Sequence, residues 1–231
     1  MKIGIVVFPG TWSDRDCKQA LNNIPNTKSS YLWHKDSNVG DVEAIILPGG
    51  FSHGDYLRAG AIAQFSPIMK EVACFAKKGF PILGICNGFQ ILCESKLLPG
   101  TLIRNRDLKF KCCDTYLKSS TRSKFSSLIY NSQVLKIPIS HGEGNYQAYP
   151  NTIKALFEND QVVFRYCSKE GYVDEDSNPN GSVDNIAGIT NIEGNVLGMM
   201  PHPERSSSLD LGSEDGNLIF RSMVESFSQA V

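Results

Sequence analysis

Short apolar runs alternate with amphipathic stretches along the first hundred residues of the chain. Residues 2–7 (Lys-Ile-Gly-Ile-Val-Val) have the length and apolar character of a buried strand, and Pro9-Gly10 would end it. The same reasoning predicts strands at 30–34, 43–47 and 80–85, and helices at 14–21, 64–78 and 87–95. This alternation favours an α/β fold with an open, mostly parallel sheet flanked by helices.

The pattern becomes richer in strands beyond residue 100. Strands are predicted at 110–118, 133–139, 161–166, 185–191 and 195–199, and a closing helix at 217–227. We expect this β-rich segment to fold back on the first sheet, and the polar stretches 105–107 and 174–181 to be flexible loops. Because no repeat or low-complexity linker marks a boundary, residues 1–231 are expected to form a single domain.

Composition and charge narrow the classes of function. The chain has 231 residues, and 41% of them are apolar. Its formal net charge is −1, so it lacks the excess of basic residues that is typical of a nucleic-acid-binding protein. No apolar run approaches the ~18 residues of a membrane helix. The cysteines number seven, and the N-terminus lacks the features of a signal peptide. We therefore expect a cytoplasmic protein without structural disulfides, and no Cys-x-x-Cys pair suggests a metal site.

One cysteine lies in a sequence that indicates catalysis. Gly84-Ile85-Cys86-Asn87-Gly88 joins a predicted strand to a predicted helix, which is the pattern of a nucleophile elbow with Cys in place of Ser. Glycines two residues to either side relieve crowding at such a sharp turn, and the start of the following helix favours an anionic sulfur. A small buried cysteine at a strand end is the alternative, but the surrounding sequence favours the nucleophile.

Two further motifs could complete such a site. A nucleophilic thiol needs a base, and the base needs a group that orients it; His202 and Glu204 are two residues apart in a segment that two prolines stiffen. A Pro-Gly-Gly sequence ending at Gly50 follows the third predicted strand, where backbone N–H groups could approach a ligand closely. We assign the two oxyanion donors to the N–H groups of Gly50 and Asn87. Each of these motifs alone is more often an ordinary turn.

Together these motifs resemble the class I, or triad-type, glutamine amidotransferases. A more specific resemblance, to the glutaminase subunits of phosphoribosylformylglycinamidine synthase, extends from residue 3 to about residue 225. The chain departs from that pattern at His53, where Tyr is expected, and residues 105–130 match weakly. The motifs that carry the resemblance include Phe8-Pro9-Gly10-Thr11, Gly54-Asp55-Tyr56-Leu57-Arg58-Ala59-Gly60, His141-Gly142-Glu143-Gly144, Asn178-Pro179-Asn180-Gly181-Ser182 and Met199–Arg205.

The resemblance implies which residues bind glutamine or react with it. The expected roles are nucleophile for Cys86, general base and acid for His202, orienting carboxylate for Glu204, oxyanion donors for Gly50 and Asn87, and substrate binding for Gln90, Gly142 and Glu143. The loop at 51–63 and the segment at 141–146 would border the face that docks on a synthetase subunit.

The resemblance also implies substrates and partners. Glutamine would be hydrolysed to glutamate and ammonia, and the ammonia would pass to the larger synthetase subunit. That subunit would use ATP and Mg to convert formylglycinamide ribonucleotide to formylglycinamidine ribonucleotide in purine biosynthesis. A small third subunit could belong to the same complex. No cofactor is expected on this chain, and neither nucleic acid nor a membrane is an expected partner.

Two other classes of function remain open at this point. A peptidase or thioesterase of related α/β fold would share the elbow and the triad, and assays with glutamine, peptides and thioesters would separate the two readings. A binding subunit that has kept the fold without catalysis would also fit. The intact Cys86, His202 and Glu204 argue against an inactive subunit.

Overall fold

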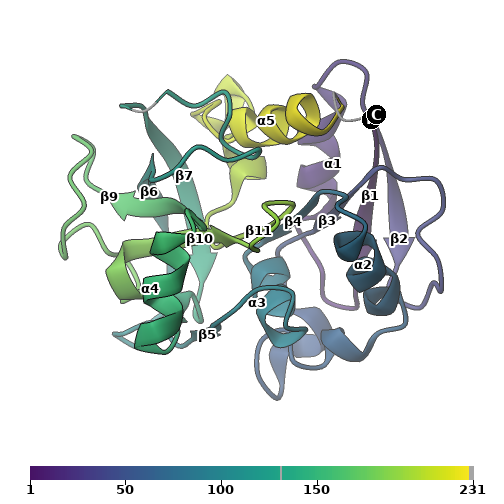
Figure 1. Cartoon of the computed structure of the whole chain (residues 1–231), viewed down its shortest axis with the longest axis horizontal. Coiled ribbons are helices and arrows are strands. Elements are labelled where there is room, and N and C mark those ends of the chain that lie inside the picture. The colour runs from purple at the N-terminus through teal and green to yellow at the C-terminus, as the bar shows by residue number, and fades with distance from the viewer. Residues whose placement is uncertain (131, 229–231) are drawn as a thin grey trace.

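Helices cover both faces of one long sheet in the computed structural model, which describes residues 1–130 and 132–228 (Figure 1). In sheet order, its parallel half consists of β2 (Lys28–Trp33), β1 (Lys2–Val7), β3 (Ala44–Leu47), β4 (Ile82–Ile85) and β11 (Val196–Met199). The order of the first four is that of flavodoxin-like sheets. The predicted α/β architecture is confirmed, and every residue of β3 and β4 is buried, as expected for strands between two layers of helices.

The other half of the sheet is antiparallel. Beyond β11 it continues with β10 (Ile186–Thr190), β9 (Val162–Cys167), β6 (Lys111–Ser119) and β7 (Val134–His141). The predicted β-rich segment is present, but it extends the edge of the first sheet and does not fold back on it, because β11 pairs directly with β4. A short pair of strands, β5 (Thr101–Ile103) and β8 (Asn145–Gln147), was not predicted.

The helices divide between the two faces of the sheet. One face carries α1 (Asp14–Asn22) and α5 (Asn217–Ser228), and the other carries α2 (Ile68–Lys77), α3 (Asn87–Glu94) and α4 (Pro150–Glu158) (Figure 1). Within the described residues, none of these helices combines the length and the hydropathy that a membrane crossing requires.

The local structure differs from the sequence predictions in one predicted helix and in one helix that was not predicted. The helix predicted at 64–78 is divided into a 3-10 turn at Ala63–Phe65 and α2, because Ser66 precedes a proline and is extended. The helix α4 was missed, although it has Pro150 in its first turn, a position that proline favours. The polar stretches expected to be flexible loops contain Asn105 and Asn180, which are both buried. Each stretch is therefore anchored in the interior at one asparagine, whose side-chain amide is hydrogen-bonded within the fold.

Glycines allow α3 to pack closely on the sheet beside the elbow. A Cβ atom on Gly88 would collide with the carbonyl oxygen of Leu47 at the end of β3. A Cβ atom on Gly198 in β11 would collide with the ring of Phe89 in α3. The helix that begins after Cys86 thus lies close to its neighbouring strands only because both positions lack a side chain.

We expect Gly88→Ala to lower the free energy of unfolding by about 1–3 kcal/mol, since an added methyl group would overpack the contact with Leu47. Urea denaturation of the variant and the parent protein would measure the loss. Gly142→Ala is a matched control, because its Cβ would meet only the Phe110 ring, at an ordinary 3.6 Å. Equal losses in the two variants would contradict this account of the packing.

Candidate active site

Cys86 occupies a strained turn between β4 and α3. Its φ and ψ are 50° and −105°, a region that residues other than glycine rarely adopt. The turn is held from both sides: the Cys86 N–H donates to the Met199 carbonyl (2.8 Å), and the Gln90 N–H donates to the Cys86 carbonyl (3.1 Å). A Cβ atom on Gly84 would lie 2.8 Å from the carbonyl oxygen of Gly88. The glycines that flank Cys86 are therefore required by the close approach of strand and helix.

His202 and Glu204 form a buried pair directly after β11. The Nδ1 atom of His202 lies 2.6 Å from Oε1 of Glu204, and each residue is only 1% exposed. The backbone N–H of His202 donates to the carbonyl of Pro138 in β7. This hydrogen bond fixes the segment that follows β11 against the antiparallel half of the sheet. The imidazole also packs on residues 48–51, the predicted oxyanion loop that follows β3, because a Cβ on Gly49 would lie 2.7 Å from Cε1 of His202. The two side chains thus face each other, as the His-x-Glu spacing predicted.

The charges around His202 favour its protonated form. Burial lowers the pKa of His202, but the Glu204 carboxylate and the Cys86 sulfur outweigh burial and raise this pKa above its usual value. Glu204 occupies Nδ1, and Nε2 makes no hydrogen bond within the described residues. Nε2 is therefore the nitrogen available to exchange a proton with the Cys86 thiol or with a bound substrate.

Two backbone N–H groups beside the thiol are free to receive an oxyanion. In the part of the chain that the structure describes, neither Gly50 nor Asn87 donates its backbone N–H in a hydrogen bond. The loop that carries Gly50 is held in place, because the Phe51 N–H donates to the Gly10 carbonyl (2.9 Å). A Cβ on Gly50 would lie 2.7 Å from that same carbonyl oxygen. A glycine is needed here for the loop to approach residues 10–12.

A cavity of about 200 Å³ opens in front of the thiol. Asn87, His202 and Glu204 lie outside its lining, and all three are almost fully buried. The other predicted residues all line it, namely Gly50, Cys86, Gln90, Gly142 and Glu143. The structure therefore gathers the predicted nucleophile, the predicted oxyanion donor Gly50 and the predicted substrate-binding residues around one small space.

Side-chain amides organise the far end of the cavity. The Ser52 N–H donates to Oδ1 of Asn87 (3.0 Å), and Nδ2 of Asn87 donates to Oε1 of Gln90 (2.9 Å). Nε2 of Gln90 in turn donates to the backbone carbonyl of Glu143 (2.6 Å). Through its side chain, Asn87 thus connects the oxyanion loop to the predicted substrate-binding residues, and its backbone N–H remains free among the residues described.

Two asparagines that the sequence analysis did not select position the wall at 141–144. Oδ1 of Asn105 accepts hydrogen bonds from Nδ1 of His141 and from the Gly144 N–H, both at 3.0 Å. Nδ2 of Asn180 donates to the Gly144 carbonyl (2.8 Å) and lies 3.4 Å from Nε2 of His141. Asn180 belongs to the Asn-Pro-Asn-Gly-Ser motif, so the motif was noticed but its function was not.

His141 is a second histidine at the cavity, and its surroundings keep it neutral. Burial and, to a smaller extent, the nearby His202 lower the pKa of His141 to about 3. Both ring nitrogens have amide neighbours, since Nδ1 donates to Asn105 and Nε2 faces Asn180. His141 therefore has a structural place in the wall, and His202 is the histidine that can serve as a base.

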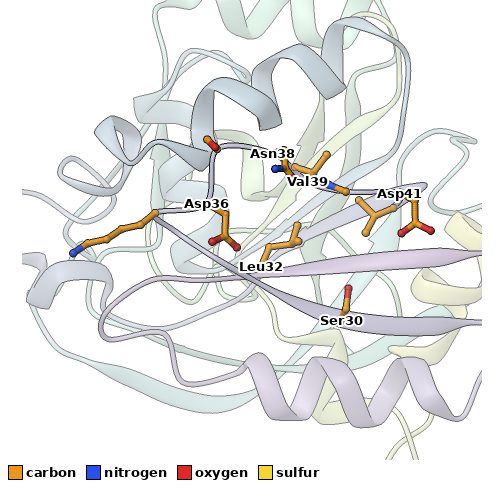
Figure 2. Close-up of a pocket in the computed structure, with 10 residues that line it drawn as sticks. Ser30, Leu32, Asp36, Asn38, Val39 and Asp41 are labelled. Carbon is orange, nitrogen blue, oxygen red and sulfur yellow. Dashed lines mark hydrogen bonds between the residues drawn. The ribbon is translucent and has the colours of Figure 1, made fainter.

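A wider hollow lies elsewhere, at the edge of the sheet beside β2. It has a volume of about 540 Å³ and is lined by residues 35–42 together with Ser30 and Leu32 (Figure 2). None of the predicted site residues lines it. Among the described residues, no cluster of three or more His, Cys, Asp or Glu side chains could hold a metal ion. Cys86 and the predicted substrate-binding residues line the smaller cavity and not this one.

The chain matches known proteins over most of its length. The family model of the CobB/CobQ-like glutamine amidotransferase domain matches residues 1–214. The chain belongs to this glutamine amidotransferase family. The resemblance inferred from the motifs is confirmed, and the amidotransferase reading prevails over the peptidase or thioesterase.

Individual relatives show which kind of amidotransferase subunit the chain is similar to. The amidotransferase is 58% identical over 222 residues to the phosphoribosylformylglycinamidine synthase subunit PurQ of Chlorobium luteolum, covering 96% of each chain. It is 54% identical to the subunit of the same name from Chlorobium chlorochromatii, covering 98% of this chain and 97% of the relative. Its structure matches a chain of PurLQS from Thermotoga maritima with a TM-score of 0.85 and 40% identity, covering 97% of both chains.

We expect His202→Ala to lower kcat for glutamine hydrolysis by roughly 10²- to 10⁴-fold, the range typical of losing a general acid–base group. Glu204→Gln should lower kcat less, because an amide oxygen can still accept the Nδ1 proton but cannot stabilise the imidazolium. Steady-state rates of glutamate formation would measure both losses. A His202→Ala variant with the parent rate would mean that another group is the base, with His141 the first to test.

Proposed function

We propose that this amidotransferase is the glutaminase subunit of phosphoribosylformylglycinamidine synthase and supplies its synthetase partner with ammonia from glutamine. The observation that carries the proposal is a strained cysteine that lines a cavity together with Gly50 and is followed by Asn87, whose backbone N–H is also free in the described chain, while a buried His–Glu pair lies close to its sulfur. The near full-length similarity to PurQ subunits supports the choice of complex.

The geometry suggests how each group acts during the reaction. The Cys86 thiolate attacks the carboxamide carbon of glutamine, and the carbonyl electron pair moves to the oxygen, which the N–H groups of Gly50 and Asn87 stabilise. The C–N bond then breaks, and ammonia leaves with a proton from Nε2 of His202. The resulting γ-glutamyl thioester is hydrolysed by water that gives a proton to His202, which releases glutamate and restores the thiol. Glu204 orients the imidazole and balances its charge throughout.

The size of the cavity supports a division of labour between subunits. About 200 Å³ has room for an amino acid but lies below the ~300–1,000 Å³ of pockets for larger ligands. We therefore assign ATP, Mg and formylglycinamide ribonucleotide to the synthetase subunit, and no cofactor to this chain. The similarity to a chain of PurLQS supports assembly with that subunit and with a small third one.

We also propose a cytoplasmic location for this chain, because such a location would keep its seven free thiols reduced.

Exposed aromatic side chains mark the face expected to meet the synthetase subunit. Phe51 and Phe110 line the cavity and are 45% and 53% exposed. Trp12 stacks on Phe51 with 6.4 Å between ring centroids and is 47% exposed. Tyr56 and Leu57, in the same loop as Phe51, are more exposed still. A cluster of large apolar side chains around the mouth of an active site is typical of a docking surface, and it lies where the resemblance placed one.

The proposed function is tested by Cys86→Ala in the complex assembled with the synthetase subunit. We expect glutamine-dependent formation of formylglycinamidine ribonucleotide to be lost, while ammonia-dependent formation continues, because only the nucleophile is removed. A glutamine-like diazo-ketone should label Cys86 in the parent protein and none of the other six cysteines, as mapped by mass spectrometry. Labelling at another cysteine, or glutamine-dependent synthesis by the variant, would overturn the assignment.

We further propose that the isolated chain is a poor glutaminase that its partner activates. The Gly50 N–H is carried by a loop that continues directly into Phe51 at the docking face, so a partner seated there can set the direction of this donor. Loss of one oxyanion donor lowers kcat by roughly 10²- to 10³-fold, and we expect a difference of that size. Glutamine hydrolysis measured with and without the assembled partner tests the idea. Equal rates would contradict the proposed activation by the partner but would leave the assignment of Cys86, His202 and Glu204 as the triad unchanged.

A further inference from the structure

An acidic side chain with no assigned role lines the same cavity as the thiol. Asp55 lies a few residues beyond the oxyanion loop and is partly buried. Its Oδ1 lies 3.4 Å from Nδ2 of Asn87, the atom that also donates to Gln90. Asp55, Asn87 and Gln90 therefore form one network that begins at the residue next to the nucleophile and reaches the predicted substrate-binding end.

The charge of Asp55 is not balanced by a protein cation. In the described part of the chain it joins no ion pair, whereas the nearby basic side chains are paired with other acids. Arg58 donates to both carboxylate oxygens of Glu94, and Nε of Arg104 lies 3.9 Å from Oε1 of Glu143. A carboxylate held at a cavity without a counter-charge favours a ligand that brings a cation.

The state of the carboxyl group agrees with that geometry. Burial is the main reason why the pKa of Asp55 is raised to about 6; the Glu143 carboxylate at the same cavity contributes to the rise, while the Gly60 N–H and the Asn87 amide oppose it. The group is therefore charged at neutral pH, but at a free-energy cost that a bound cation would relieve. The backbone is also unusual here, since His53, Gly54 and Asp55 have φ values of 54°, 77° and 51°. Only a loop held by its surroundings keeps such a run.

We propose that Asp55 binds the α-ammonium group of glutamine and so selects an α-amino acid amide over other carboxamides. The inference rests on the proposed function, because it requires the carboxamide of glutamine to lie at Cys86. With that end fixed, the α-carbon lies toward Gln90, whose side chain adjoins Asp55 through Asn87. Gln90 offers the ligand hydrogen bonds but no charge, and Asp55 supplies the missing charge.

The test compares glutamine with glutaramate, which is glutamine without its α-amino group, in the assembled complex. We expect Asp55→Asn to raise KM for glutamine by roughly 30-fold or more, the effect of removing one partner of a desolvated charge pair. KM for glutaramate should change little, so the preference for glutamine should largely disappear. Asp114→Asn is a matched control, because it removes the same charge from an exposed position on β6 that pairs with Lys136.

The outcomes separate this proposal from the proposed function. An equal rise of KM for both substrates would mean that Asp55 only shapes the loop, and an unchanged KM for glutamine would mean that it does not meet the ammonium; either result overturns the proposal. A parent complex that does not hydrolyse glutamine, or a Cys86→Ala complex that does, would overturn the proposed function instead.

A measurement on the parent complex keeps the proposal testable if the variant fails to fold. The ratio of kcat/KM for glutamine to that for glutaramate cancels contributions from Cys86 and His202, which act on both substrates. Because kcat/KM reports groups of the free enzyme, this ratio should fall as the pH is lowered through about 6, where Asp55 becomes protonated. Glu143 faces the same cavity but has Arg104 beside it, and His141 stays neutral. A ratio that is constant from about pH 7.5 to about pH 5 would overturn the proposal.

Discussion

The parallel pairing of β4 with β3 on one side and β11 on the other decides where every catalytic group lies. Gly84 of β4 lies opposite Leu47 of β3 and opposite Gly198 of β11, so the three strands end nearly level. The oxyanion loop, the nucleophile and the His–Glu pair each follow one of these strands, and they meet at one edge of the sheet although more than a hundred residues separate the first from the last. A slip of one residue in either pairing would turn the side chains of that strand to the opposite face.

This arrangement holds groups that would be unfavourable elsewhere. Cys86 has a positive φ, and His202 and Glu204 are almost fully buried. The strain persists because hydrogen bonds fix the elbow on both sides, and because α3 packs on the sheet through Gly88. The protonated form of the buried imidazole is stabilised mainly by the Glu204 carboxylate and further by the Cys86 sulfur, so removing Glu204 would leave a buried charge with less compensation. The contacts that pack the helix on the sheet are therefore also the contacts that hold the predicted catalytic groups in position.

Local sequence patterns predict the groups that follow strands but not those that contact each other across the fold. Apolar runs of four to six residues identified β1, β3 and β4, and the glycines around Cys86 identified the elbow, because both signals are complete within a few residues. Asn105 and Asn180 were read as parts of flexible loops, since their partners His141 and Gly144 lie 36 or more residues away. Strand periodicity likewise does not say which strand pairs with which, so the direction in which the β-rich segment extends could not be derived.

The loop from Gly49 to Gly60 combines three proposed functions in one stretch of backbone. It carries an oxyanion donor at Gly50, an exposed aromatic side chain at Phe51 and the cavity carboxylate at Asp55. Its link to the nucleophile is direct, because the Ser52 N–H donates to the side chain of Asn87. A displacement of Phe51 by a docked subunit would therefore move the donor and the carboxylate together. Partner binding would then alter both kcat and KM for glutamine, whereas control of the donor alone would alter only kcat.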